Sequence, residues 1–99
     1  MARFSVYGNP EGEGFLLDVQ ANLLSHLNTR MVVPLLPAAS APTPAQILNP
    51  MFEIHGSQYV MATQYMAAVP SKMLKEPVQS AADRTFEITS ALDCLFQGV

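Results

Sequence analysis

The sequence predicts a mainly β protein with one C-terminal α-helix. Short apolar runs bounded by glycine, proline or asparagine are typical of antiparallel strands and their connecting turns. An apolar stripe at helical spacing near the C-terminus predicts the helix. Several strands followed by one helix indicate an antiparallel sheet or small barrel on which the helix packs. A chain of 99 residues is expected to form a single domain, residues 1–99.

The amino-acid composition argues against several classes of function for this chain. Hydrophobic residues make up 49% of the chain and charged residues only 13%, so part of the apolar surface is expected in an oligomer interface. The net charge of −3 argues against nucleic-acid binding through phosphates. Cys94 is the single cysteine, which indicates a reducing compartment, the cytoplasm. The sequence contains neither a signal peptide nor the ~20 apolar residues of a membrane span.

The first elements are predicted to form a hairpin. Alternation over residues 2–7 predicts a half-buried strand with Phe4 and Val6 on its inner face. The glycine-rich segment 8–14 predicts an exposed loop. Residues 15–20 read as a second strand that pairs with the first across this long tip.

The central segment is predicted to contain a third strand and a long loop. Residues 22–28 are expected to form a helical turn or a loop before a strand over residues 29–36. Pro34 has no N–H to donate, so it must lie at a bulge, a strand end or an outward-facing position. The proline-rich segment 37–50 is predicted to be a loop.

A second hairpin and a broken strand are expected next. The apolar runs 52–55 and 58–63 flank Gly56-Ser57, and a two-residue turn that begins with glycine favours type II′. Residues 66–74, which contain Pro70, are predicted to be a further, interrupted strand.

The C-terminal helix is predicted to open at Ser80. Its hydroxyl can cap the helix, and Asp83 three residues later completes a variant of the capping box. Gly98 is placed where a helix would end. The apolar stripe is expected to comprise Ile88, Leu92, Leu95 and Phe96.

The residues provide no clear catalytic constellation. His26 and His55 lie far apart, and neither has a second ligand at metal-binding spacing. Sequence motifs for hydrolases, phosphate loops and zinc proteases are absent. Asp18, in a strand, could be a base, but such a carboxylate more commonly caps a turn or pairs with an arginine such as Arg30. No catalytic residue, metal site or cofactor is therefore expected.

Four sequence blocks stand out: LLDVQ at 16–20, NTRMVVPL at 28–35, MATQYMAAVP at 61–70 and LFQGV at 95–99. Together they resemble the CcdB family, the toxins of plasmid-type toxin–antitoxin systems that poison DNA gyrase. The blocks occur in the family's order, and the resemblance extends over essentially the whole chain, with segment 37–50 the least similar. The resemblance implies an SH3-like antiparallel barrel or sheet of the CcdB and MazF type, assembled as a two-fold homodimer.

The resemblance also implies partners and contact residues. Members bind the A subunit of gyrase and trap its complex with cleaved DNA, without a catalytic site of their own. The residues that fall at the gyrase-binding positions are Leu23, Leu24, Asp93, Gln97, Gly98 and Val99. A CcdA-like antitoxin is expected to fold onto the toxin, in contact with Gly8, Asn9, Pro10, Glu11, Pro42 and Pro44.

One departure from the family leaves alternatives open. The best-known tail reads Trp-Gly-Ile, whereas this chain has Gln97-Gly98-Val99. The resemblance implies that the tryptophan stacks on an arginine of gyrase, and Gln97 can only accept a hydrogen bond there. An inactive homologue that still binds antitoxin is therefore one alternative. A second is a MazF-like endoribonuclease, against which the net charge of −3 argues.

Overall fold

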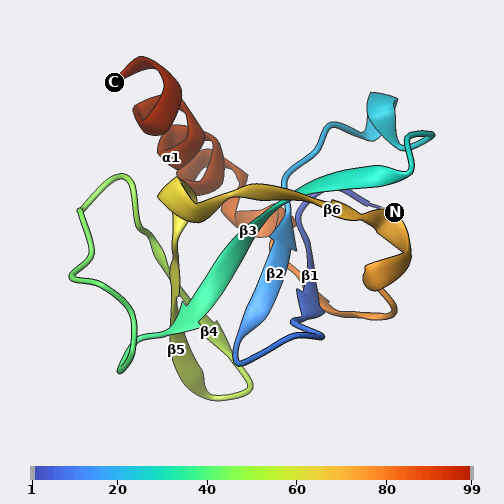
Figure 1. Ribbon diagram of the computed structural model, residues 1–99. Helices are drawn as coiled ribbons and strands as arrows, with labels where there is room; N and C mark the ends of the chain where they lie inside the picture. The colour runs from blue at the N-terminus through green and yellow to red at the C-terminus, as the bar shows by residue number, and fades with distance from the viewer. Residues whose placement is uncertain (1, 99) are drawn as a thin grey trace.

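A curled antiparallel sheet with one helix packed against it forms the structure, a computed structural model that describes residues 2–98 (Figure 1). This confirms the predicted mainly β class with a C-terminal helix. The helix α1 spans Thr85–Gln97. The strands are β1 (Ser5–Gly8), β2 (Phe15–Asp18), β3 (Thr29–Pro37), β4 (Met51–Ile54), β5 (Ser57–Met61), β6 (Ala67–Pro70) and β7 (Pro77–Ser80). Short 3-10 turns are η1 (Asn22–Leu24), η2 (Thr63–Tyr65), η3 (Ser71–Met73) and η4 (Ala82–Arg84).

The long strand β3 organises the sheet. The strand order is β4-β5-β3-β2-β1-β7, and β6 also pairs with β3. Along one edge β3 pairs with β2, while its other edge pairs with β6 over residues 29–32 and with β5 over residues 35–37. Pro34 lies at the junction between these two partners, where the sheet ladder does not require its missing N–H. Its carbonyl accepts the Ala62 N–H at 2.9 Å.

Both faces of the sheet centre are buried, so the prediction of a half-buried first strand was wrong. Alternate residues of a strand point to opposite faces. Val6 lies in the main core, which the helix residues Ile88 and Ala91 complete. Tyr7 lies in a second cluster with Leu16, Val32 and Leu74. The second cluster depends on Leu74, a residue distant in sequence, and local alternation cannot reveal such a cover.

The turn between β4 and β5 differs from the prediction by one residue. Ile54 pairs with Ser57, so His55 and Gly56 are the central turn residues. Their φ angles are 52° and 81°. Positive φ at both positions is the signature of a type I′ turn, not of type II′ at Gly56-Ser57.

The start of the helix also required correction. Ser80 ends β7, a strand the sequence did not predict, and its hydroxyl accepts the Ala82 N–H at 3.1 Å before η4. No side chain caps α1, and Asp83 forms no capping box. Residues 71–73 form the turn η3 where a broken strand was expected. Ile88 is buried and Leu92 packs on the core as predicted, but Phe96 is 70% exposed.

Gly14 closes the first hairpin, and we expect Gly14→Ala to destabilise the protein. Its φ is +84°, and an added Cβ would lie 2.2 Å from the Leu35 carbonyl oxygen. Strained backbone of this kind costs about 1–3 kcal/mol, and the clash adds to it, so the free energy of unfolding should fall by more than ~2 kcal/mol. Urea unfolding measures the change. Gly8→Ala is the control, because no atom lies within 4 Å of a Cβ there.

Candidate functional site

The end of α1 presents the predicted gyrase-binding tip. Gly98 adopts a left-handed conformation with φ 75°, and its N–H donates to the Cys94 carbonyl at 3.0 Å. This confirms Gly98 as the helix-ending residue. Gln97 and Gly98 are exposed, and Val99 lies outside the described residues. Asp93 is exposed one helical turn before Gln97, which places the two side chains on one face of the helix.

The apolar part of the predicted gyrase-binding set lies on η1. Leu23 is 86% exposed, and Leu24 and Leu27 are also exposed. Exposed leucines are unremarkable singly, but a cluster on one short turn is typical of a contact surface. Figure 1 places η1 and the end of α1 at separate ends of the same side of the protein. One chain therefore does not bring Leu23 and Leu24 together with Gln97.

The strands β3 and β6, which lie between these two elements in Figure 1, expose no charged side chain. From residue 19 to residue 52 the sequence has one charged residue, Arg30, and that side chain is buried. Residues 54–71 contain no Asp, Glu, Lys or Arg. Ala67 and Ala68 of β6 are exposed, as is Met31 opposite Ala68 on β3. Depletion of charge combined with exposed apolar side chains is typical of the core of a protein–protein interface.

The predicted antitoxin-binding residues lie on two exposed loops. Gly8, Pro10 and Glu11 are exposed, and the Asn9 side chain accepts the Glu11 N–H at 3.0 Å. Pro42 and Pro44 are exposed in the longer loop. The two loops leave the sheet at neighbouring positions, because Phe15 pairs with Leu35. The structure thus brings together the bases of the loops, beside Gly14 and Pro37.

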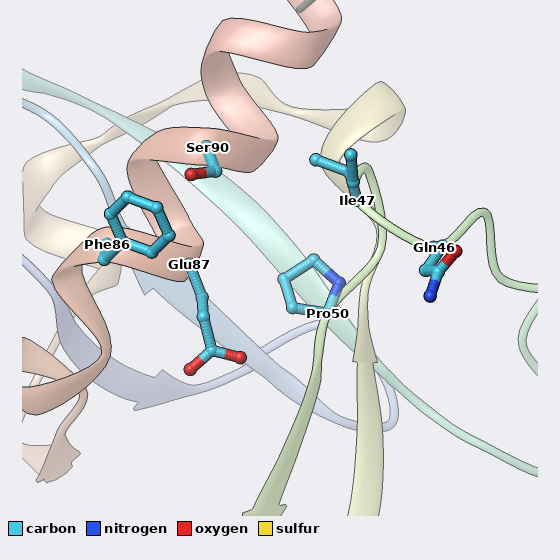
Figure 2. Close-up of a pocket in the computed structure, with 6 residues that line it drawn as sticks. All are labelled: Gln46, Ile47, Pro50, Phe86, Glu87 and Ser90. Carbon is cyan, nitrogen blue, oxygen red and sulfur yellow. The ribbon is translucent and has the colours of Figure 1, made fainter.

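A groove that the sequence did not reveal lies between the longer loop and α1 (Figure 2). It has a volume of about 320 Å³ and is lined by Gln46, Ile47, Pro50, Phe86, Glu87 and Ser90. Two of these residues, Ile47 and Phe86, are large and apolar, and their exposed fractions are 57% and 82%. The sequence contains one indication of this surface. Phe86 is an apolar residue of the helix that lies outside its apolar stripe, so it could have been predicted to be exposed.

Buried Asn49 holds the loop side of the groove in place. Its Nδ2 donates to the Met61 carbonyl at 2.9 Å and to Gln64 Oε1 at 2.8 Å. Its Oδ1 accepts the Ala45 N–H at 2.9 Å. A buried amide with all these partners fixes the backbone around it, so the loop side of the groove is held in place.

Arg84 ties the start of α1 to β4 beside the groove. It forms an ion pair with Glu87, lies 4.2 Å from the centre of the Phe52 ring, and donates to the Met51 carbonyl at 2.8 Å. The hydrogen bond with Glu87 raises the pKa of Arg84, and the same bond lowers the pKa of Glu87. The exposed pair is therefore fully charged at neutral pH.

Asp18 is engaged by an arginine, as the more common of the two interpretations predicted. Arg30 Nη2 lies 2.8 Å from Asp18 Oδ2, and both side chains are fully buried. Burial, followed by the negative charge of Asp18, raises the pKa of Tyr7, so this phenol stays protonated. A paired carboxylate and a neutral phenol do not form an acid–base couple at the surface.

The part of the chain that the structure describes offers few other groups suited to catalysis or metal binding. Within residues 2–98, no three His, Cys, Asp or Glu side chains gather as a metal site would require. None of the helices in this range is long and apolar enough to cross a membrane. The Arg3 guanidinium lies 4.5 Å from the centre of the Phe4 ring. Among residues 2–98, Lys72 and Lys75 are the Lys and Arg side chains that have neither an ion pair nor a contact with an aromatic ring.

Comparison with models of protein families gives one finding. The family model described as CcdB protein matches residues 3–98, nearly the whole chain. The match includes the hairpin, the turn η1, the loops and the helix end whose geometry is given above.

Proposed function

This chain belongs to the CcdB family, and from that membership we propose that it is the toxin of a toxin–antitoxin system. It binds the A subunit of DNA gyrase and traps the enzyme on cleaved DNA. The family match over residues 3–98 is the observation that carries the proposal. The exposed helix end and the apolar turn η1 supply surfaces suited to such a contact. The proposed action needs no catalytic group on this chain, because gyrase itself cleaves the DNA.

The proposed active form is a two-fold homodimer. In one chain, η1 and the end of α1 lie apart on the same side, with the uncharged surface of β3 and β6 between them (Figure 1). A two-fold axis through this surface would place η1 of one protomer near α1 of its partner. Such an isologous interface would bury apolar groups without burying an unpaired charge, and it would complete the gyrase-binding set.

Antitoxin binding is proposed at the two loops and at the groove between the longer loop and α1. Loops 8–14 and 38–50 leave the sheet from neighbouring positions, so one extended segment can contact both. The groove between Ile47 and Phe86 is large enough for an apolar side chain of that segment. Because Asn49 holds this groove in shape, the antitoxin alone would need to become ordered on binding.

Gln97 supports a second candidate, an inactive homologue that retains antitoxin binding. We expect Gln97→Trp to strengthen gyrase binding about two- to thirtyfold, because stacking on an arginine contributes ~0.5–2 kcal/mol. Fluorescence anisotropy with the gyrase A subunit measures the change, and Gln58→Trp on the exposed side of β5 is the matched control. Toxicity that arises only in the Gln97→Trp variant would establish the inactive-homologue alternative. Equal affinities for the two variants would show that position 97 does not face an arginine.

A supercoiled-plasmid assay tests the proposed function directly. Purified protein is incubated with gyrase, ATP and plasmid, and the reaction is stopped with detergent and protease. Linear DNA is the expected product, and its amount should fall when the cognate antitoxin is added. Absence of linear DNA, together with cleavage of an added RNA, would overturn the proposal in favour of a MazF-like nuclease.

A further inference from the structure

The surface that carries Leu23 and Leu24 is not held in place by burial. All residues from 21 to 29 are exposed, and η1 contains no buried residue. Ala21 precedes η1 without a side-chain cap. We call residues 21–27 the contact turn. Because apolar packing does not fix this turn, hydrogen bonds to the rest of the protein must set its position.

The backbone of Gln20, immediately before the contact turn, is fixed by the buried ion pair. Its N–H donates to Asp18 Oδ1 at 3.0 Å, and its carbonyl accepts from Arg30 Nη2 at 3.4 Å. Asp18 and Arg30 are both fully buried and paired with each other at 2.8 Å. Gln20 lies two residues past the end of β2, and its backbone is therefore held at both its N–H and its carbonyl.

The side-chain amide of Gln20 joins β3 to the contact turn. Its Oε1 accepts the Met31 N–H at 3.0 Å, and its Nε2 donates to the Leu24 carbonyl at 3.0 Å. The same carbonyl accepts the Leu27 N–H at 3.1 Å, so Nε2 binds at the centre of the turn. A primary amide supplies both a donor and an acceptor, and a carboxylate or a hydrocarbon cannot make both bonds.

Other hydrogen bonds hold the ends of this segment. The Asn22 side chain accepts the Arg3 N–H at 2.8 Å, and the Asn28 carbonyl accepts the Ser71 N–H at 2.9 Å. Neither reaches the backbone between Leu23 and Leu27. Among residues 2–98, Gln20 supplies the side chain that bonds to this central part of the turn.

We propose that Gln20 is a positioning residue for gyrase binding. Its backbone is held by the buried Asp18–Arg30 pair and its side chain binds the Leu24 carbonyl, so Leu23 and Leu24 are presented in a fixed arrangement. The inference rests on the proposed function, and it assigns to Gln20 a role that neither its exposure nor its sequence context predicts. A mobile turn would have to be ordered at each encounter, and that cost would weaken binding.

Two variants both remove the bond from the Gln20 amide to the Leu24 carbonyl. Gln20→Ala removes both bonds, whereas Gln20→Glu keeps an acceptor for the Met31 N–H and places a carboxylate against the Leu24 carbonyl. We expect either change to weaken gyrase binding about five- to tenfold, as the loss of one well-formed hydrogen bond would. Gln79→Ala, at a half-buried glutamine of β7, is the matched control and should bind as wild type does.

Amide hydrogen exchange gives a readout that does not depend on gyrase. Protection of the Leu24, Ser25 and Leu27 amides should fall about tenfold in both Gln20 variants, while Leu17 and Val33 remain protected. Unchanged protection of the turn, or reduced protection with unchanged gyrase affinity in both variants, would overturn the inference. If the wild-type protein does not bind gyrase, the proposed function fails, and the exchange data alone decide whether Gln20 holds the turn.

Discussion

Removal of Gln97, Gly98 and Val99 is expected to abolish gyrase binding and leave the protein folded. Residues at the centre of a binding surface commonly contribute ~2–4 kcal/mol each, so affinity should fall about a hundredfold or more. Gln97 and Gly98 are exposed, and the hydrogen bond of Gly98 is to Cys94 of the same helix. Their loss should therefore change the free energy of unfolding by less than ~1 kcal/mol.

The experiment compares gyrase binding, antitoxin binding and thermal unfolding of the truncated and full-length proteins. Retained antitoxin binding serves as the control for folding, because the proposed antitoxin surface lies on the loops and the groove of Ile47 and Phe86. Gyrase affinity that survives truncation would show that the helix end is not the contact. A truncated protein that unfolds would show that the tail is structural.

Breaking the buried ion pair is expected to have the largest effect on stability. Arg30→Leu leaves the Asp18 carboxylate buried without its partner, and Asp18→Leu leaves the guanidinium of Arg30 in the same state. Removal of one member of such a pair costs about 3–5 kcal/mol, a large part of the ~5–15 kcal/mol that stabilises a typical domain. Both single variants should therefore be largely destabilised at neutral pH.

Urea unfolding at a fixed protein concentration measures these effects. The double variant Asp18→Leu with Arg30→Leu should lose less stability than the two single variants combined, because it leaves no charge unpaired. Glu87→Gln is the matched control at the exposed pair with Arg84, where a change below ~1 kcal/mol is expected. Additive losses in the double variant would show that Asp18 and Arg30 act independently.

Local sequence patterns predicted the strands and the helix that depend on residues close together in the sequence. The first hairpin, the strand over residues 29–36, the second hairpin and the C-terminal helix all depend on alternation, turn residues or helical spacing. The pairing of Asp18 with Arg30 was also foreseen, as part of the interpretation that a lone carboxylate in a strand caps a turn or pairs with an arginine. The family resemblance, confirmed over residues 3–98, added the fold type and the predicted contact residues.

Features that depend on distant segments were missed. The strand β7 is four residues long and begins with Pro77, so it lacks a strand pattern of its own and exists because β1 offers an edge. The first strand was predicted to be half-buried, because its local pattern does not show that Leu74 packs beside Tyr7. The bonds of Gln20 join backbone groups of residues 24 and 31, which only the folded chain brings together.

The pairing of β1 with β7 has a consequence for how the chain folds as it is synthesised. β1 to β3 are adjacent in sequence and can pair early, but Ser5 pairs with Ser80, and Ile88 and Ala91 fill the core only after that. Contacts between such distant residues form slowly, and domains made on the ribosome complete folding when their last contacts emerge. The nascent chain therefore carries an open sheet edge and an unfilled core until residues 77–91 have been made. The proposed toxicity requires the end of α1, so it can begin only after β7 and this helix have been made and have joined the sheet.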